Sequence, residues 1–486
     1  MKYIKSSILA MAALAMPLLS SCDALDEDLT GQPTTDKFFN TLADFNSFIA
    51  GAYTPLYAIF GSDAPYVATA GGEDVNVSSV VRWRGFENCD ITTVSNPDEI
   101  TDVLWNNSYA SISACNTLIS LVAQNDKLAP EALEPIEGEA RFLRAMSYFN
   151  MVRWFGEIPV LTEDNQSNAT QEPQSPVTDI YDFIVSDLKE AELLLPETVD
   201  NPSKPCRLAA SALLAKVYLT MAGFPLNRSE LYASARDKAW SVIESGRYSL
   251  QPTFLNLWLF DHRYTNGEFI FTLYASSDNG TGGYVNRAVR PVAEGGWADW
   301  TSDRRFMQTF PGGARFDGTF YLNFNDGSIW QDEQVAEPYV GKLRDGGPKS
   351  GGYYGSSEAN LADGFYCMLR YADILLIYAE AANLAEGTPS AKALKALNDV
   401  RERAGLDAYG SLSHEAFDKA VLDERNWELA FECNRWFDLC RRHMVADIAR
   451  IYSPASSVSD NNYLLPKPND QLAIMLGVTQ NPGYNR

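Results

Sequence analysis

The strongest constraint on the fold is the helical spacing of apolar residues over four long stretches of the chain. These stretches are residues 37–60, 99–155, 176–247 and 366–448. Between Val177 and Leu195 the apolar positions follow an i, i+3, i+4, i+7 pattern, which places them on one face of a helix. Pro196 ends that pattern because proline has no backbone N–H to donate. The periodicity therefore predicts a mainly α-helical fold.

Two of the stretches are interrupted in the manner of helical hairpins. Gly223 is followed by Phe-Pro and divides residues 208–245 into two helical segments, and Gly387 divides residues 371–400. The spacing of large, small and aromatic residues is a weak version of the tetratricopeptide pattern and lacks its full signature. We expect a tetratricopeptide-like scaffold of helical hairpins.

Residues from about 250 to 365 have a different character. They are rich in glycine, aromatic residues and aspartate, and sustained helical patterns are few. Residues 269–274, with the sequence FIFTLY, are an example of a predicted short strand. We expect an irregular second half, rich in loops and short strands, on which binding residues are usually found.

The N-terminus has the features of an exported, anchored protein. Residues 1–21 resemble a signal peptide, since lysines precede an apolar run at residues 8–19 that is too short to cross a bilayer. Leu19-Ser20-Ser21-Cys22 resembles a lipobox, which predicts acylation of Cys22 and anchoring in lipid. Residues 22–36 are predicted to be an acidic tether.

The acidic net charge and the scarcity of metal-binding residues argue against several classes of partner for this chain. The formal net charge of −24 disfavours binding to nucleic acid phosphates, so no nucleic acid partner is expected. The chain has three histidines and no CxxC pair, which makes a zinc site a poor hypothesis. We predict no metal and no cofactor.

One cluster of charged residues invites a catalytic interpretation. Its members are Glu424, Glu428, Glu432, Arg435, Asp438, Arg441 and Arg442, which we expect on one helix. Carboxylates four residues apart on a helix are about 6 Å apart, close to the separation in a retaining glycosidase. However, Glu432 with Arg435 and Asp438 with Arg441 or Arg442 are at the spacing of intrahelical ion pairs. We interpret the cluster as structural and predict no catalytic residues and no enzyme.

Four segments carry more specific motifs. These are EARFLRA at 139–145 with RWFGEIP at 153–159, RYADILL at 370–376, DERNWELAFE at 423–432 with RWFDL at 435–439, and QNPGY at 480–484. Their order and spacing resemble the SusD/RagB family of nutrient-binding lipoproteins from the surface of Bacteroidetes. The acidic residues after Cys22 are similar to the export signal of such lipoproteins.

The resemblance implies a fold, a place and a partner. It implies an N-terminal helical region at 37–250 and a C-terminal region with ligand-binding loops at 251–486, packed as one globular unit. It places the protein at the cell surface, anchored in the outer membrane. The implied partner is a SusC-like, TonB-dependent outer-membrane barrel, and the usual ligands are oligosaccharides, with peptides in some members.

Two loop-like segments contain suitable groups for binding a sugar. Sugars present apolar C–H faces surrounded by hydroxyls, so their sites combine exposed aromatic rings with orienting polar groups. We predict Trp83, Trp297 and Trp300 as stacking platforms. The predicted polar contacts come from Asp74, Arg84, Asp299 and Tyr284, and Tyr353 and Tyr354 are secondary candidates.

Four functions remain open at this point. The first is a glycan-binding lid that delivers oligosaccharides to the barrel, and the second is a peptide-binding lid on the same scaffold. The third is a surface glycoside hydrolase, which requires a carboxylate pair in a cleft. The fourth is a purely structural role, as a chaperone of the barrel or as a lid that has no ligand of its own.

Overall fold

The structure is a computed structural model of the 486-residue chain. It describes residues 39–77, 80–356, 359–453 and 457–484. The predicted signal peptide, Cys22 and the acidic tether lie outside the described residues. Within the described part of the chain, no helix is both long enough and apolar enough to cross a membrane.

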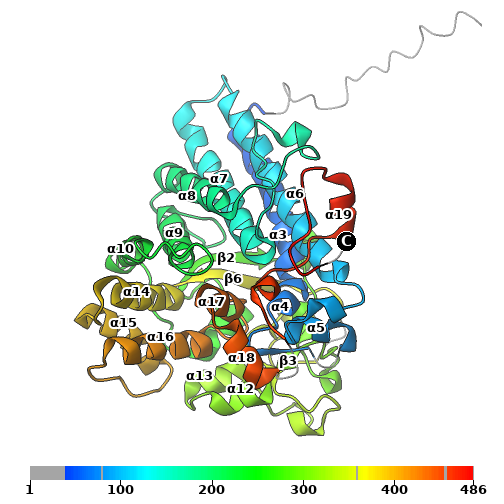
Figure 1. The fold of residues 1–486 in the computed structure, drawn as a ribbon, viewed down its shortest axis with the longest axis vertical. Coiled ribbons are helices and arrows are strands. Elements are labelled where there is room, and N and C mark those ends of the chain that lie inside the picture. The colour runs from blue at the N-terminus through cyan, green and yellow to red at the C-terminus, as the bar shows by residue number, and fades with distance from the viewer. Residues whose placement is uncertain (1–38, 78–79, 357–358, 454–456, 485–486) are drawn as a thin grey trace, which may run out of the picture.

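Antiparallel helices form the scaffold, as the sequence predicted (Figure 1). Each of them packs on its neighbour in the row. In chain order they are α3 (Leu42–Phe60), α6 (Asp98–Ala123), α7 (Pro130–Phe155), α8 (Val177–Leu194), α9 (Arg207–Ala222) and α10 (Leu231–Glu244). The row continues through α14 (Tyr371–Glu386), α15 (Ala391–Arg403) and α16 (His414–Glu428), because α10 packs against α14.

Local sequence explains the packing of these helices. The predicted apolar stripe of α8 is buried, including Ile180, Ile184 and Leu188. Helix α9 is buried on most of its sides, between α8 and α10. Ala235 and Ala239 on α10 are fully buried and leave room for close approach of neighbouring helices. The helical periodicity therefore predicted both the elements and their buried faces.

The charged segment after α16 differs from the expectation of one helix. Helix α16 ends at Glu428, and α17 (Arg435–Arg441) begins after a turn. Phe431 and Cys433 in that turn have φ angles of 63° and 53°, which belong to the left-handed region and interrupt a helix. The carboxylates expected on one helix are therefore divided, with Glu424 and Glu428 on α16, Glu432 in the turn and Asp438 on α17.

The second half is irregular and contains short strands. Strand β2 (Phe269–Ala275) confirms the predicted strand and pairs antiparallel with β6 (Gly364–Arg370), with Thr272 opposite Cys367. The expectation of helix from residue 366 was wrong, because residues 364–370 extend to pair with β2. The other paired strands are β1 (Val75–Asn76) with β3 (Thr301–Ser302), and β4 (Phe320–Tyr321) with β5 (Tyr339–Val340).

The other α-helices in the described part of the chain are short. They are α4 (Ala64–Ala68), α5 (Arg84–Glu87), α11 (Val285–Ala288), α12 (Arg304–Thr309), α13 (Ala314–Thr319), α18 (Val445–Tyr452) and α19 (Asn469–Ile474). In Figure 1 the N-terminal α4 and α5 lie beside the C-terminal α17 and α18. An ion pair between Glu73 and Arg435, at 2.5 Å, joins the same two regions. One hydrophobic core extends from Phe39 to Val478 and is shared by both halves.

Candidate ligand-binding surface

A two-stranded pairing brings the two segments predicted to bind ligand together. Strand β1 pairs with β3, so that Val75 lies opposite Ser302 and Asn76 opposite Thr301. The chain that precedes β3 carries Trp297 and Asp299, and the chain that follows β1 leads to Arg82 on a short 3-10 turn. Residues more than 200 positions apart therefore contribute to one surface.

The Trp297 loop folds back on α11 and is held by backbone hydrogen bonds. The Trp297 N–H donates to the Arg287 carbonyl at 3.0 Å, and the Asp299 N–H donates to the Ala288 carbonyl at 2.8 Å. Gly296 lies so close to the Arg290 carbonyl oxygen that an added Cβ would be 2.0 Å from it. Glycine is required here because any side chain would push the loop away from α11.

Close backbone contact also fixes the position of Tyr284. Its N–H donates to the carbonyl of Gly61, the residue that ends α3, at 2.8 Å. A Cβ added to Gly283 would lie 2.6 Å from the Gly61 Cα atom. The two glycines therefore let the C-terminal end of α3 anchor the start of α11.

Trp297 and Tyr284 form an accessible aromatic pair. Trp297 is 39% exposed, and its ring centroid is 5.7 Å from that of Tyr284, with the rings tilted by 52°. The Arg287 guanidinium lies over the Trp297 ring, 4.8 Å from its centroid. The contacts of Tyr284 and Arg287 restrict the indole and still leave much of its surface open.

Charged groups lie next to this aromatic pair. Arg82 and Glu99 form a two-pronged ion pair, with donor–acceptor distances of 2.8 and 2.7 Å. Partial burial raises the pKa of Asp299, the Arg82 charge opposes that shift, and the Glu99 charge adds to it. Asp299, Arg82 and Glu99 therefore share one neighbourhood that can both donate and accept hydrogen bonds.

Two of the predicted stacking platforms are buried, and the prediction is wrong for them. Trp300 is fully buried, stacks on Tyr66 with ring centroids 4.6 Å apart, and donates its indole N–H to Asp63 at 3.0 Å. Trp83 is also buried, and Arg82 lies over its ring. Both rings belong to the main hydrophobic core, so neither presents a face to a ligand.

Of the two polar residues predicted in the first segment, Asp74 is buried and Arg84 is exposed. Asp74 is buried and accepts a hydrogen bond from the Phe431 N–H at 2.9 Å, and burial raises its pKa to about 6. It stabilises the turn between α16 and α17, so its predicted role in binding is wrong. Arg84 is exposed at the start of α5, yet the arginine whose charge acts on Asp299 is Arg82.

Neither Glu99 nor Arg82 was predicted from the sequence to belong to the ligand-binding surface. No sequence pattern distinguishes Glu99, because an acidic residue in the first turn of a helix such as α6 is ordinary. Arg82 stands beside Arg84 in the sequence, and spacing alone does not distinguish them. Of the two secondary candidates, Tyr354 is exposed and Tyr353 is buried.

The charged cluster near the end of α16 is a buried ion network. Glu428 lies 2.6 Å from Arg370 and 3.0 Å from Arg315, and the nearby arginines hold the pKa of its carboxyl well below the usual range. Glu432 pairs with Arg370 and Lys342, so the predicted pair with Arg435 is wrong. The predicted pair between Asp438 and Arg441 is present at 2.8 Å.

The geometry of this network does not suit glycosidase chemistry. Glu424 and Glu428 are fully buried, and a glycosidase needs one carboxyl that can protonate a bound sugar. Among the described residues, no group of three His, Cys, Asp or Glu side chains is arranged to hold a metal ion. The cysteines in the described part of the chain are free thiols.

Comparisons with known families agree with the sequence motifs. Residues 317–484 match the model of the SusD family, and residues 26–219 match a SusD-like family described as "Starch-binding associating with outer membrane". The chain belongs to the SusD family. The SusD-like protein P2 of Formosa agariphila is 26% identical and aligns over 96% of this chain and 97% of its own length. A SusD-like protein of Bacteroides ovatus is also 26% identical, over 90% of this chain and 82% of its own.

Solved structures share the fold of this SusD-family protein. A SusD superfamily protein from Parabacteroides distasonis superposes with a TM-score of 0.78 at 25% identity, covering 91% of this chain and 99% of its own. A laminarin binding SusD-like protein has a TM-score of 0.77 at 23% identity, covering 92% and 100%. Surface glycan-binding protein A from Bacteroides uniformis has a TM-score of 0.76 at 20% identity, covering 91% and 99%.

Proposed function

We propose that this SusD-family protein is a surface lipoprotein that binds oligosaccharides and delivers them to a SusC-like, TonB-dependent barrel in the outer membrane. Support comes from the family described as starch-binding and associated with the outer membrane. Further support comes from the shared fold of a laminarin binding SusD-like protein and of surface glycan-binding proteins. The exposed Trp297 ring, which lies against the half-buried Tyr284 and beside Asp299, is the observation that carries the proposal for this chain.

Trp297 supplies the stacking surface. A pyranose ring has an apolar face of axial C–H groups that packs on an aromatic ring, and an exposed indole offers the largest such surface among side chains. Arg287 and Tyr284 contact the indole and limit its motion. A restricted ring loses less conformational entropy when the sugar binds, which strengthens binding.

The neighbouring charged groups supply orientation. Asp299 accepts hydrogen bonds from sugar hydroxyls, and Arg82 donates to hydroxyl or carboxylate oxygens of the sugar. Their arrangement at the edge of the aromatic pair fits a ligand that stacks on Trp297 and extends toward the Arg82–Glu99 pair. The Tyr284 hydroxyl lies against the buried residues Ser62 and Asp63, so Tyr284 contributes its ring to this surface and not its hydroxyl.

Acylated Cys22 anchors the protein in outer-membrane lipid, and residues 22–36 form the acidic tether. The protein binds its ligand without cleaving it, because Glu424 and Glu428, the carboxylates considered as a catalytic pair, are buried in ion pairs with arginines.

A glycan screen of the soluble chain without its lipid anchor tests the proposal. We expect binding to one polysaccharide class, and Trp297→Ala weakens it by at least about tenfold through the loss of stacking. Tyr264→Ala is the matched control, because Tyr264 is also an exposed aromatic residue but is not part of the Trp297 loop.

The result that contradicts the proposal is equal glycan affinity of the Trp297→Ala variant and the unmodified chain. An absence of glycan binding, together with saturable binding of peptides that depends on Trp297, identifies a peptide-binding lid instead. Release of new reducing ends from a bound polysaccharide by the purified protein identifies a hydrolase.

A further inference from the structure

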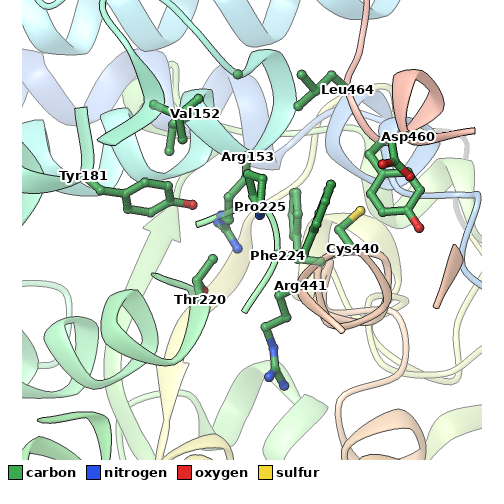
Figure 2. Close-up of a pocket in the computed structure, with 14 residues that line it drawn as sticks. Val152, Arg153, Tyr181, Thr220, Phe224, Pro225, Cys440, Arg441, Asp460 and Leu464 are labelled. Atoms are coloured by element: carbon green, nitrogen blue, oxygen red, sulfur yellow. The ribbon is translucent and has the colours of Figure 1, made fainter. Parts of the chain in front are cut away.

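A second candidate binding site lies away from the Trp297 surface. A pocket of about 190 Å³ is enclosed by α7, α8, α9, α17 and the segment that follows α18 (Figure 2). Its walls are mostly apolar and include Val152, Val177, Phe224, Phe437 and Leu464. None of the residues predicted to bind glycan lines it.

Arg153 on α7 contributes a charge to this pocket that no carboxylate neutralises. Its guanidinium lies between two rings, 3.8 Å from the Phe149 centroid and 4.0 Å from the Phe437 centroid. Its Nε donates to the Phe149 carbonyl at 2.9 Å, and one Nη donates to the Asn150 side chain at 2.5 Å. Within the described part of the chain, no carboxylate forms an ion pair with Arg153, and its Nη1 has no hydrogen-bond partner.

Other arginines nearby show how unusual this arrangement is. Arg144, on the same helix, pairs with Asp187 at 2.7 Å. Arg441 also lines the pocket but pairs with Glu380 and Asp438 at 2.5 and 2.8 Å. Burial without a compensating carboxylate lowers the pKa of Arg153 to about 10, which still leaves it charged at neutral pH.

Tyr181 on α8 provides a second unused donor. The residue is 4% exposed, and its hydroxyl has no hydrogen-bond partner among the residues that the structure describes. In Figure 2 the Tyr181 hydroxyl points toward Arg153, and both side chains line the same pocket. Both donors lack a protein partner and belong to residues that line one pocket, so a ligand acceptor bound there can accept from both.

We propose that this pocket binds a compact monocarboxylate with an apolar body, such as an aromatic acid. The carboxylate accepts hydrogen bonds from the Arg153 Nη1 and the Tyr181 hydroxyl, and it supplies the negative charge that the partly buried guanidinium lacks. The rings of Phe149 and Phe437 cover the flat faces of the guanidinium, which leaves its edge for the ligand. The apolar walls contact the body of the ligand.

The volume of the pocket and the charges at its rim agree with a small aromatic acid as the ligand. A cavity of roughly 150 Å³ is sufficient to hold benzene, so a pocket slightly larger than that accommodates a benzoate-sized acid. Asp460, a carboxylate among the described lining residues, pairs with His443 at 2.8 Å, and both side chains are more than half exposed. Asp460 is therefore engaged at the rim and does not neutralise Arg153.

Titration of the mature chain with benzoate tests the proposal, with Cys22 replaced by serine to prevent lipidation. Benzyl alcohol, which has a similar size and no charge, is the matched ligand. For a ligand of nine heavy atoms we expect saturable benzoate binding with a Kd near or below about 1 mM, and at least about tenfold weaker binding of benzyl alcohol. Tyr181→Phe removes only the hydroxyl and weakens benzoate binding by about three- to tenfold.

Arg153→Met retains an apolar stem and weakens benzoate binding by at least about thirtyfold. Arg247→Met removes an exposed arginine outside the pocket and leaves the affinity unchanged. If Arg153→Met does not fold, Tyr181→Phe and the comparison of the two ligands decide the outcome. Three results would each overturn the proposal. They are equal binding of benzoate and benzyl alcohol, no saturable benzoate binding at about 10 mM, and full benzoate affinity in Tyr181→Phe.

This site is independent of the proposed glycan surface. We expect Trp297→Ala to retain its benzoate affinity and Tyr181→Phe to retain its glycan affinity. Failure of one proposal therefore leaves the other intact.

Discussion

The indole N–H of Trp300 donates a hydrogen bond to the buried carboxyl of Asp63, with 3.0 Å between Nε1 and Oδ1. Burial raises the pKa of Asp63 to about 8, the charge of Asp299 adds to the shift, and the hydrogen bond from Trp300 opposes it. The pKa of an aspartate in an unfolded chain is about 3.9. The folded state therefore holds this proton more tightly than the unfolded state does.

This shift predicts a specific pH dependence of stability. A raised folded-state pKa gives a stability contribution that is fully present below about pH 4 and is lost as the pH rises through about 8. Asp63→Asn keeps the size of the side chain and an acceptor for Trp300, but it cannot ionise. We expect the melting temperature of the unmodified protein to fall by a few degrees more than that of the variant between pH 5 and pH 9. If the melting temperatures of the two proteins change in parallel with pH, the raised pKa of Asp63 is contradicted.

Gly296 provides a test of how the Trp297 ring is presented. In Gly296→Ala the new Cβ meets the Arg290 carbonyl, so we expect the loop to leave α11 and glycan affinity to fall by about tenfold although Trp297 is still present. Gly410→Ala is the matched control, because a Cβ there meets nothing within 4 Å. Affinity titration with the glycan identified in the screen provides the measurement. Unchanged glycan affinity in Gly296→Ala shows that glycan binding does not need the Trp297 loop to lie against α11.

The ion network around Glu428 predicts a large effect on stability. Glu428→Gln leaves Arg370, Arg315 and Arg403 buried with less compensating charge, which costs about 3–5 kcal/mol of unfolding free energy. Asp423→Asn on the same helix removes an exposed pair with Lys419 and costs less than about 1 kcal/mol. Urea denaturation of both variants measures the difference. Similar midpoints for the two variants mean that the buried network contributes no more than a surface pair.

The lipid anchor is tested in cells that export the protein. Cys22→Ser removes the acceptor for acylation, and the loss of the acyl chains removes stable membrane attachment. We expect the variant in the soluble fraction and the unmodified protein in the outer-membrane fraction. Ser21→Ala serves as a control, because alanine is also a small residue at the position before the cysteine. Retention of Cys22→Ser in the membrane fraction rules out anchoring through this residue.

Local spacing was sufficient to predict the helices and their buried faces. The stripe of α8 needs only the repeat of its own apolar residues, and an apolar face on a helix is buried in any compact fold. Motifs such as RYADILL and DERNWELAFE also identified the family. In the fold, Arg370 and Glu428 from these two motifs meet at 2.6 Å inside the core.

Exposure at the ligand-binding surface was decided by tertiary structure. Trp297 and Trp300 are three residues apart and both follow a pair of glycines, yet one is exposed and the other buried. Trp300 is buried because Tyr66 and Asp63, more than 230 positions earlier in the chain, stack on its ring and accept its N–H. Trp297 stays exposed because its loop turns back on α11. Helical spacing depends on neighbours in the sequence, whereas burial of a loop side chain depends on which distant segments pack over it.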